Sequence, residues 1–216
     1  MPYERKGFGL EQATSSGKQR VVEALWAAVA RDGVAGVSVR SVAAEAGVTG
    51  GTVQYHFPTR TEMLRYAMEL IAQRVEERLI AMPRSGPAHE WTRALLLELL
   101  PLDRQRHHEF SVWLAFFAHA STDPSLARLK RQTASRQREL YRHIIRARTG
   151  ADADPRRPSG TDGPDEPAAA LLHAVIDGLA LQLADLDVAE AAVVGPALLD
   201  HYLAHCVDSP QSPGPL

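Results

Sequence analysis

The sequence predicts an all-α protein of about nine helices, with a small three-helix head followed by a larger helical body. Three observations support this prediction. Apolar residues recur three and four positions apart along most of the chain, which is the period of an amphipathic helix. Ser and Thr residues precede several of these segments, where a helix needs an N-cap. No alternating apolar and polar segment is long enough for a β-strand, and no internal repeat is present.

The overall composition is that of a globular protein. Of 216 residues, 45% are hydrophobic, and the formal net charge is −2, so any DNA-binding surface must be local. The single Cys206 permits no internal disulfide, and the N-terminal residues lack the apolar segment of a secretory signal, so we expect a cytoplasmic protein. Uninterrupted apolar runs fall far short of the ~20 residues that a membrane span needs, so we expect no membrane association.

The first 64 residues predict a flexible arm followed by a small helical domain. Residues 1–17 show no sustained period and are expected to form a flexible N-terminal arm. A helix is expected from about Lys18 to Asp32, and Gly33 should end it. Residues 18–64 would then form a helix-turn-helix domain.

Residues 38–60 carry the helix-turn-helix spacing. Ser38, Thr49 and Thr59 each stand where a helix N-cap would accept from a backbone amide, and Gly47 suits the left-handed C-cap between two short helices. The spacing is that of a helix-turn-helix, so the second short helix is the candidate reader of DNA.

Residues 43–58, AAEAGVTGGTVQYHFP, resemble the DNA-binding domain of TetR-type repressors, and the resemblance extends over residues 18–65. It implies that the following residues lie towards DNA: Ser38, Arg40, Thr49, Gly50, Gly51, Gln54, Tyr55, His56, Thr59 and Arg60. Arg40 and Gln54 are best able to read base edges, whereas the other polar side chains suit phosphates. Gln54 departs from the family pattern, which more often has an aromatic residue there and a lysine at the position of Arg60.

Residues 65–207 are expected to form the body. The capping-box sequence Thr59 to Glu62 begins a long helix that Met82-Pro83 should stop. Residues 106–121 are apolar almost all round and should be buried. The arginine-rich face of residues 124–148 should be solvated rather than bound to DNA. Residues 149–167 are expected to form a mobile loop, Gly195-Pro196 to kink or restart the last helix, and residues 208–216 to be a disordered tail.

The body also resembles the C-terminal domain of betaine-repressor proteins, through RHHEFSVWLAFFAHASTDPSLARL and IDGLALQL. This resemblance implies an effector cavity lined by Trp91, Leu95, Leu99, Phe110, Trp113, Phe117 and His143. Aromatic faces beside Glu98 or Glu109 would favour a cation, whereas apolar bulk alone would favour a hydrophobic metabolite. Surplus apolar surface on the last two helices predicts a homodimer, through Leu171, Leu172, Val175, Leu179, Leu183, Leu198 and Tyr202.

Other chemistries find little support in the sequence. His107, His108, Glu109 and His119 lack the spacing of a metal site, and no nucleophile or phosphate-binding motif is present. We therefore expect no catalytic residue, no metal and no cofactor. The function predicted is a dimeric, ligand-responsive transcriptional repressor that binds a pseudo-palindromic operator and is released by a small-molecule effector. The alternative is a ligand-independent dimeric DNA-binding or architectural protein.

Overall fold

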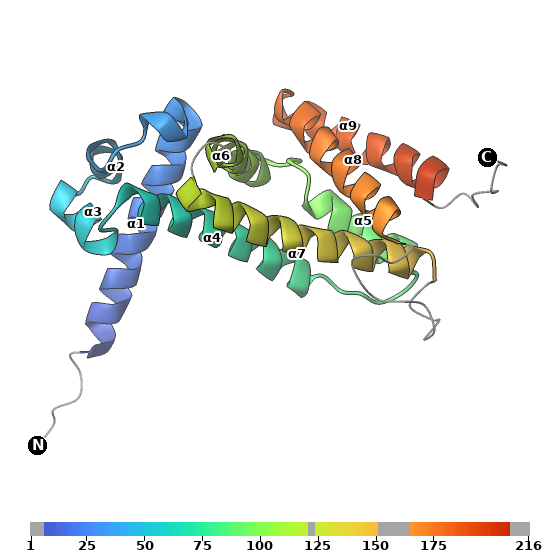
Figure 1. Ribbon diagram of the computed structural model, residues 1–216, viewed down its shortest axis with the longest axis horizontal. Helices are drawn as coiled ribbons and strands as arrows, with labels where there is room; N and C mark the ends of the chain where they lie inside the picture. The colour runs from blue at the N-terminus through green and yellow to red at the C-terminus, as the bar shows by residue number, and fades with distance from the viewer. Residues whose placement is uncertain (1–6, 121–123, 151–164, 208–216) are drawn as a thin grey trace, which may run out of the picture. The chain divides into compact units, whose positions relative to one another are not determined.

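The computed structural model describes residues 7–120, 124–150 and 165–207 (Figure 1). In these ranges the chain forms nine α-helices, a final π-helical turn and no β-strand, which confirms the all-α prediction. The elements are α1 (Gly7–Gly36), α2 (Val39–Ala46), α3 (Gly50–His56), α4 (Arg60–Ala81), α5 (Ala88–Glu98), α6 (Arg104–Ala120), α7 (Pro124–Arg148), α8 (Glu166–Ala184), α9 (Val188–Tyr202) and η2 (Leu203–Val207). The expected loop over residues 149–167 and the expected tail lie mostly outside the described residues.

The helices belong to two compact units. The first consists of Met1–Ala72 and Ser111–Lys130, and the second of Gln73–Phe110 and Arg131–Leu216. Helices α4, α6 and α7 therefore each contribute to both units, whereas the sequence suggested one boundary between residues 64 and 65. Within the first unit, apolar side chains of α6 line the same small cavity as side chains of α1 and α4. A segment from the middle of the chain thus completes the core of the head.

Helix α1 is longer than the sequence predicted. It begins at Gly7, so most of the expected flexible arm over residues 1–17 continues the helix instead. Adding residues to an existing helix is much easier than nucleating one, so a segment without apolar periodicity can extend it. Lys18 ties this part of α1 to α4, because its Nζ lies 3.8 Å from the ring centroid of Tyr66. Gly33, with φ at 69°, interrupts the helix at the predicted position.

Apolar side chains of α5, α7, α8 and α9 form the core of the second unit, where α8 and α9 are drawn in orange and red (Figure 1). Gly195 of α9 is buried so closely that an added Cβ would lie 2.5 Å from the side chain of Leu102. Helix α9 continues through Pro196, so the helix does not restart there, and the expected kink stays a prediction. Pro196 donates no backbone hydrogen bond, yet the α-helix continues to Tyr202.

The arginine-rich helix α7 is only partly solvated. Arg131 and Arg138 are exposed, as expected, but Arg142 is buried. Arg142 donates to the carboxylate of Glu166 over 2.9 Å and also pairs with Glu139. The expectation of a fully solvated face was therefore wrong for the C-terminal half of α7, because acidic partners take the guanidinium groups there.

Helix α6 is not buried all round either. Val112 and Phe116 are buried, whereas the next residue, Phe117, is 37% exposed. The aromatic ring of Phe117 stacks on Trp113 with centroids 4.9 Å apart, and the Nζ of Lys130 lies 3.9 Å from the Phe117 centroid. A partly exposed aromatic pair thus takes the place of the expected continuous core.

Candidate nucleic-acid interface and effector region

Two side-chain caps shape the helix-turn-helix. The Ser38 hydroxyl accepts from the amide of Ser41 over 3.0 Å, and the Ser41 hydroxyl accepts from the amide of Ser38 over 2.9 Å. The Thr49 hydroxyl accepts from the amide of Thr52 over 3.2 Å at the start of α3. Gly47 stands between the helices with φ at 64°. These bonds satisfy amides that a helix start leaves unbonded, so the sequence determines the turn locally.

The outer face of the head carries the predicted base-reading side chains. Arg40, Gln54 and Tyr55 are exposed, and Tyr55 is 78% exposed, although its ring is the kind of group that usually packs. Thr49 and Gly51 are exposed beside them, at the start of α3. The guanidinium of Arg40 and the amide of Gln54 offer the donors and acceptors that can distinguish base edges in the major groove.

His56 differs from its neighbours on α3. It is only half exposed, and its Nε2 lies 3.4 Å from the place where a Cβ on Gly17 would stand, so the ring lies against α1. Its ring also meets Tyr55 edge to face, with centroids 5.2 Å apart. The His56 ring thus has contacts with α1 and Tyr55, and its expected contact with DNA stays a prediction.

Arg60 and Thr59 are used within the fold. The Nε of Arg60 donates to the carbonyl of Val37 over 2.9 Å, and its Nη2 donates to the carbonyl of Val34. The Thr59 hydroxyl accepts from the amide of Glu62 over 3.1 Å, which completes the predicted capping box. Arg60 thus bonds carbonyls near the end of α1, and Thr59 bonds the amide and carboxylate of Glu62. The expected role of both side chains as DNA contacts stays a prediction.

Arg31 is a head residue that the sequence did not single out. Its Nη1 lies 2.7 Å from Glu45 on α2, and its Nη2 lies 2.9 Å from Asp32. Hydrogen bonds to these two carboxylates raise the pKa of the guanidinium above its ordinary value. The ion pair between Arg31 and Glu45 joins the end of α1 to α2, and only the folded chain brings these two charges together.

The residues expected to line an effector cavity divide between the two units. Trp91, Leu95, Leu99, Phe110 and His143 belong to the second unit, and Trp113 and Phe117 belong to the first. In the second unit the rings of Trp91 and His143 lie with centroids 5.8 Å apart. Leu95 is fully buried in the core cluster, so it supports the fold there. The shared effector cavity stays a prediction.

Glu98 and Glu109 are both held by arginines in the second unit. Arg78 donates to Glu98 over 2.6 Å and to Glu109 over 2.8 Å, and Arg106 lies 3.2 Å from Glu98. Burial alone would lower the pKa of Arg78, but the bonds to Glu109 and Glu98 raise it. Arg106 also lies 2.7 Å from Asp103, so two guanidinium groups pair with three carboxylates. A cationic effector would have to compete with these arginines for Glu98 or Glu109.

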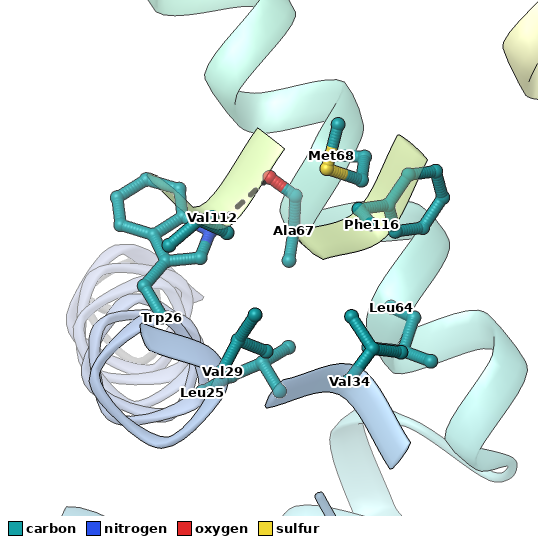
Figure 2. Close-up of a pocket in the computed structure, with 9 residues that line it drawn as sticks. All are labelled: Leu25, Trp26, Val29, Val34, Leu64, Ala67, Met68, Val112 and Phe116. Carbon is teal, nitrogen blue, oxygen red and sulfur yellow. Dashed lines mark hydrogen bonds between the residues drawn. The ribbon is translucent and has the colours of Figure 1, made fainter. Parts of the chain in front are cut away.

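A small apolar cavity lies in the core of the first unit (Figure 2). Its volume is about 10 Å³, which is close to the least that holds one water molecule. Beside it the Trp26 Nε1 donates to the carbonyl of Ala67 over 3.3 Å. The cavity is lined by apolar side chains of α1, α4 and α6, namely Leu25, Trp26, Val29, Val34, Leu64, Ala67, Met68, Val112 and Phe116. It is a packing defect of the head and too small for an effector.

Helices α8 and α9 expose apolar side chains. Leu171, Leu181, Val193 and Leu198 are 57%, 49%, 73% and 41% exposed. Within the part of the chain that the structure describes, α8 is also long and apolar enough to cross a membrane, and 28% of its most apolar 18 residues are buried. The sequence alone predicted no membrane association. Length and composition alone are weak evidence for a membrane span, and an exposed apolar face also suits a helix interface.

Not all residues predicted for the dimer interface are exposed in this way. Leu172 and Leu183 are fully buried in the core of their own chain, so their expected place in an interface was wrong. Val175, Leu179 and Tyr202 are half-buried. A helix that is apolar on two faces has the same apolar periodicity on both. The sequence therefore does not tell which face lies in the core, and only the packing of the folded chain decides this.

The chain is similar to known regulators along most of its length. Residues 21–67 match the profile of bacterial regulatory proteins of the tetR family, and residues 88–208 match that of the C-terminal domain of BetI-type transcriptional repressors. The regulator BetI 2 of Chromohalobacter salexigens is 28% identical over 87% of this chain and 89% of its own. The regulator PksA of Bacillus subtilis is 34% identical over 105 residues, and this match spans about half of each protein, 48% and 51%.

Solved structures of transcriptional regulators have a similar fold. A transcriptional regulator from Rhodococcus sp. Rha1 is 32% identical, with a TM-score of 0.71 over 89% of this chain and 98% of its own. A regulator from Saccharomonospora viridis in complex with choline is 25% identical, with a TM-score of 0.75 over the same two fractions.

Proposed function

The chain belongs to the TetR family of bacterial transcriptional regulators, and we propose that this DNA-binding regulator of the repressor type acts as a dimer that a small-molecule effector releases from its operator. The match to a BetI-type C-terminal domain over residues 88–208 is the observation that supports an effector, together with the choline complex of the Saccharomonospora viridis relative. We place this activity in the cytoplasm, where the exposed thiol of Cys206 would stay reduced.

The DNA-reading surface proposed consists of Ser38, Arg40, Thr49, Gly51, Gln54 and Tyr55. Hydroxyl groups at the N-termini of α2 and α3 suit phosphate oxygens, and Arg40 and Gln54 suit base edges. All six residues are exposed on α2, α3 or their caps. Gly50 lies half-buried at the first turn of α3 and lets the helix start approach the duplex closely.

The dimer proposed is formed by the exposed apolar side chains of α8 and α9. Leu171, Leu181, Val193 and Leu198 leave this face uncovered in the single chain. A two-fold pairing would cover the same surface on both copies and place two heads on the two halves of a pseudo-palindromic site.

The effector proposed is bound in the helical body. The ion pairs of Arg78 make a cationic effector less favourable, because Glu98 and Glu109 already have a cationic partner. An aromatic or apolar compound needs no free carboxylate, whereas a quaternary ammonium ion such as choline would rely on aromatic faces alone.

Selection from a random DNA duplex library tests the DNA-binding part. The protein should return a pseudo-palindromic site, and Arg40→Ala should weaken binding to it. Arg131→Ala is a matched control, since it removes an exposed arginine from α7 outside the proposed surface. Equal weakening by both variants would show that charge, not the head, governs binding.

Release of the selected DNA tests the effector. Fluorescence anisotropy should show release by choline or by a neutral aromatic compound. If neither class releases DNA at any soluble concentration, the ligand-independent dimer becomes the better description.

A further inference from the structure

Two exposed histidines lie together at the end of helix α9. His201 is in the last turn of α9, and His205 follows four residues later in the π-helical turn Leu203–Val207. Their rings stack with centroids 4.3 Å apart and planes inclined by 28°. Residues four apart share one helix face, so both imidazoles point to the same side.

A hydrogen bond to a backbone carbonyl orients the His205 ring. The Nδ1 of His205 lies 2.8 Å from the carbonyl oxygen of His201. A carbonyl oxygen can only accept, so this nitrogen carries the proton and donates it, which leaves the lone pair of the neutral ring on Nε2. Histidine ligands of metal ions are held in the same way, with one nitrogen donating to a carbonyl and the other bound to the metal.

We propose that His201 and His205 form a chelating site for one divalent transition-metal ion of the imidazole-binding class, such as Ni²⁺, Zn²⁺ or Cu²⁺. A zinc to nitrogen bond is about 2.0–2.1 Å, so two nitrogens bound to one tetrahedral ion lie about 3.3–3.4 Å apart. In the structure the rings are stacked, so rotation of the His201 ring out of the stack is needed to bring one of its nitrogens and Nε2 of His205 onto one ion. Both histidines are exposed in the single chain.

The local backbone adds a second observation. The α-helix gives way to a π-helical turn at Leu203, between the two histidines. Such turns are rare, cost regular hydrogen bonding and occur frequently at functional sites. Here the turn lies where the His201 carbonyl accepts from a side chain.

The site uses two protein ligands. Within the residues that the structure describes, no group of three or more His, Cys, Asp or Glu side chains could hold a metal ion. The proposed site does not include the neighbouring Cys206, and the Cys206→Ser variant tests this. Water would fill the remaining coordination positions, and an ion held in this way exchanges readily.

Titration calorimetry of the untagged full-length protein with Ni²⁺ tests the site. Wild-type protein should bind one ion per chain. His201→Asn and His205→Asn should each weaken binding by about tenfold or more, because the second contact of a chelate forms at high effective concentration. His89→Asn is the matched control, as His89 is equally exposed on the surface of α5 and has no histidine one turn away, and it should bind as the wild type does.

The opposite results would overturn the proposal. It is wrong if both histidine variants bind Ni²⁺ as tightly as the wild type, or if Cys206→Ser abolishes binding while His201→Asn does not. Circular dichroism checks that each variant is folded, and both substitutions change exposed side chains only. The result does not depend on operator binding, so failure here leaves the proposed repressor function untouched.

Discussion

Arg78 on α4 joins Glu109 on α6 through a guanidinium to carboxylate bond of 2.8 Å, and Glu109 is only 5% exposed. The same guanidinium holds Glu98 at the end of α5 over 2.6 Å. One side chain therefore fastens three helices of the second unit.

Removing this guanidinium should destabilise the protein. Arg78→Ala leaves the carboxylate of Glu109 buried without its cation, which typically costs about 3–5 kcal/mol. Urea unfolding should show this loss in the midpoint. Arg65→Ala is the control, because the exposed pair of Arg65 with Glu69 contributes only about 0.5 kcal/mol. A similar small loss for both variants would mean that the Arg78 pair is solvated.

Substitution of Arg60 should lower the stability of the protein more than its affinity for DNA. Arg60→Ala removes bonds to the carbonyls of Val34 and Val37, so we expect a loss of about 1–3 kcal/mol in unfolding experiments. Arg40→Ala removes an exposed side chain and should leave stability unchanged while weakening operator binding. If Arg60→Ala instead keeps full stability and loses DNA binding, Arg60 is a phosphate contact as the family resemblance implied.

Gln54 and Tyr55 should separate specificity from affinity. A glutamine amide can bond both adenine N6 and N7, which is worth about 1–3 kcal/mol of discrimination. Gln54→Ala should therefore relax sequence preference, and Tyr55→Phe should weaken all sites nearly equally. Binding of both variants to an operator library measures this. Uniform weakening by Gln54→Ala would assign Gln54 to positioning the head.

The exposed faces of α8 and α9 should hold the dimer together. The double substitution of Leu181→Glu and Val193→Glu would bury charges in the proposed interface. It should give monomers in analytical ultracentrifugation. Ile80→Glu is the control, because Ile80 is 68% exposed at the end of α4. A dimer that survives the double substitution would place the interface elsewhere.

Asp103 should contribute to stability in a pH-dependent way. Partial burial would raise its pKa, but hydrogen bonds from the backbone and side chain of Arg106 hold it below the usual range. A depressed pKa in the folded state stabilises the protein above the unfolded pKa of about 3.9, and this contribution is lost as pH falls through the folded value. Asp103→Asn should therefore reduce stability at pH 7 and flatten its decline below about pH 4. An unchanged acid limb of the unfolding curve would contradict this.

The head was predictable in detail because local chemistry determines it. Ser38, Gly47 and Thr49 act through bonds to amides three residues away or through their own backbone angle, so their roles follow from sequence alone. The capping box at Thr59 and the interruption at Gly33 follow for the same reason.

Tertiary packing decided which side chains were left for function. Arg60 has the chemistry of a phosphate contact, but carbonyls from 23 and 26 residues earlier in the chain take its guanidinium. Leu172 and Leu171 are the same residue type on one helix, and only the placement of α5, α7 and α9 buries the first and exposes the second. Such partners come from distant parts of the sequence, and local periodicity carries no information about which of two apolar faces they will cover.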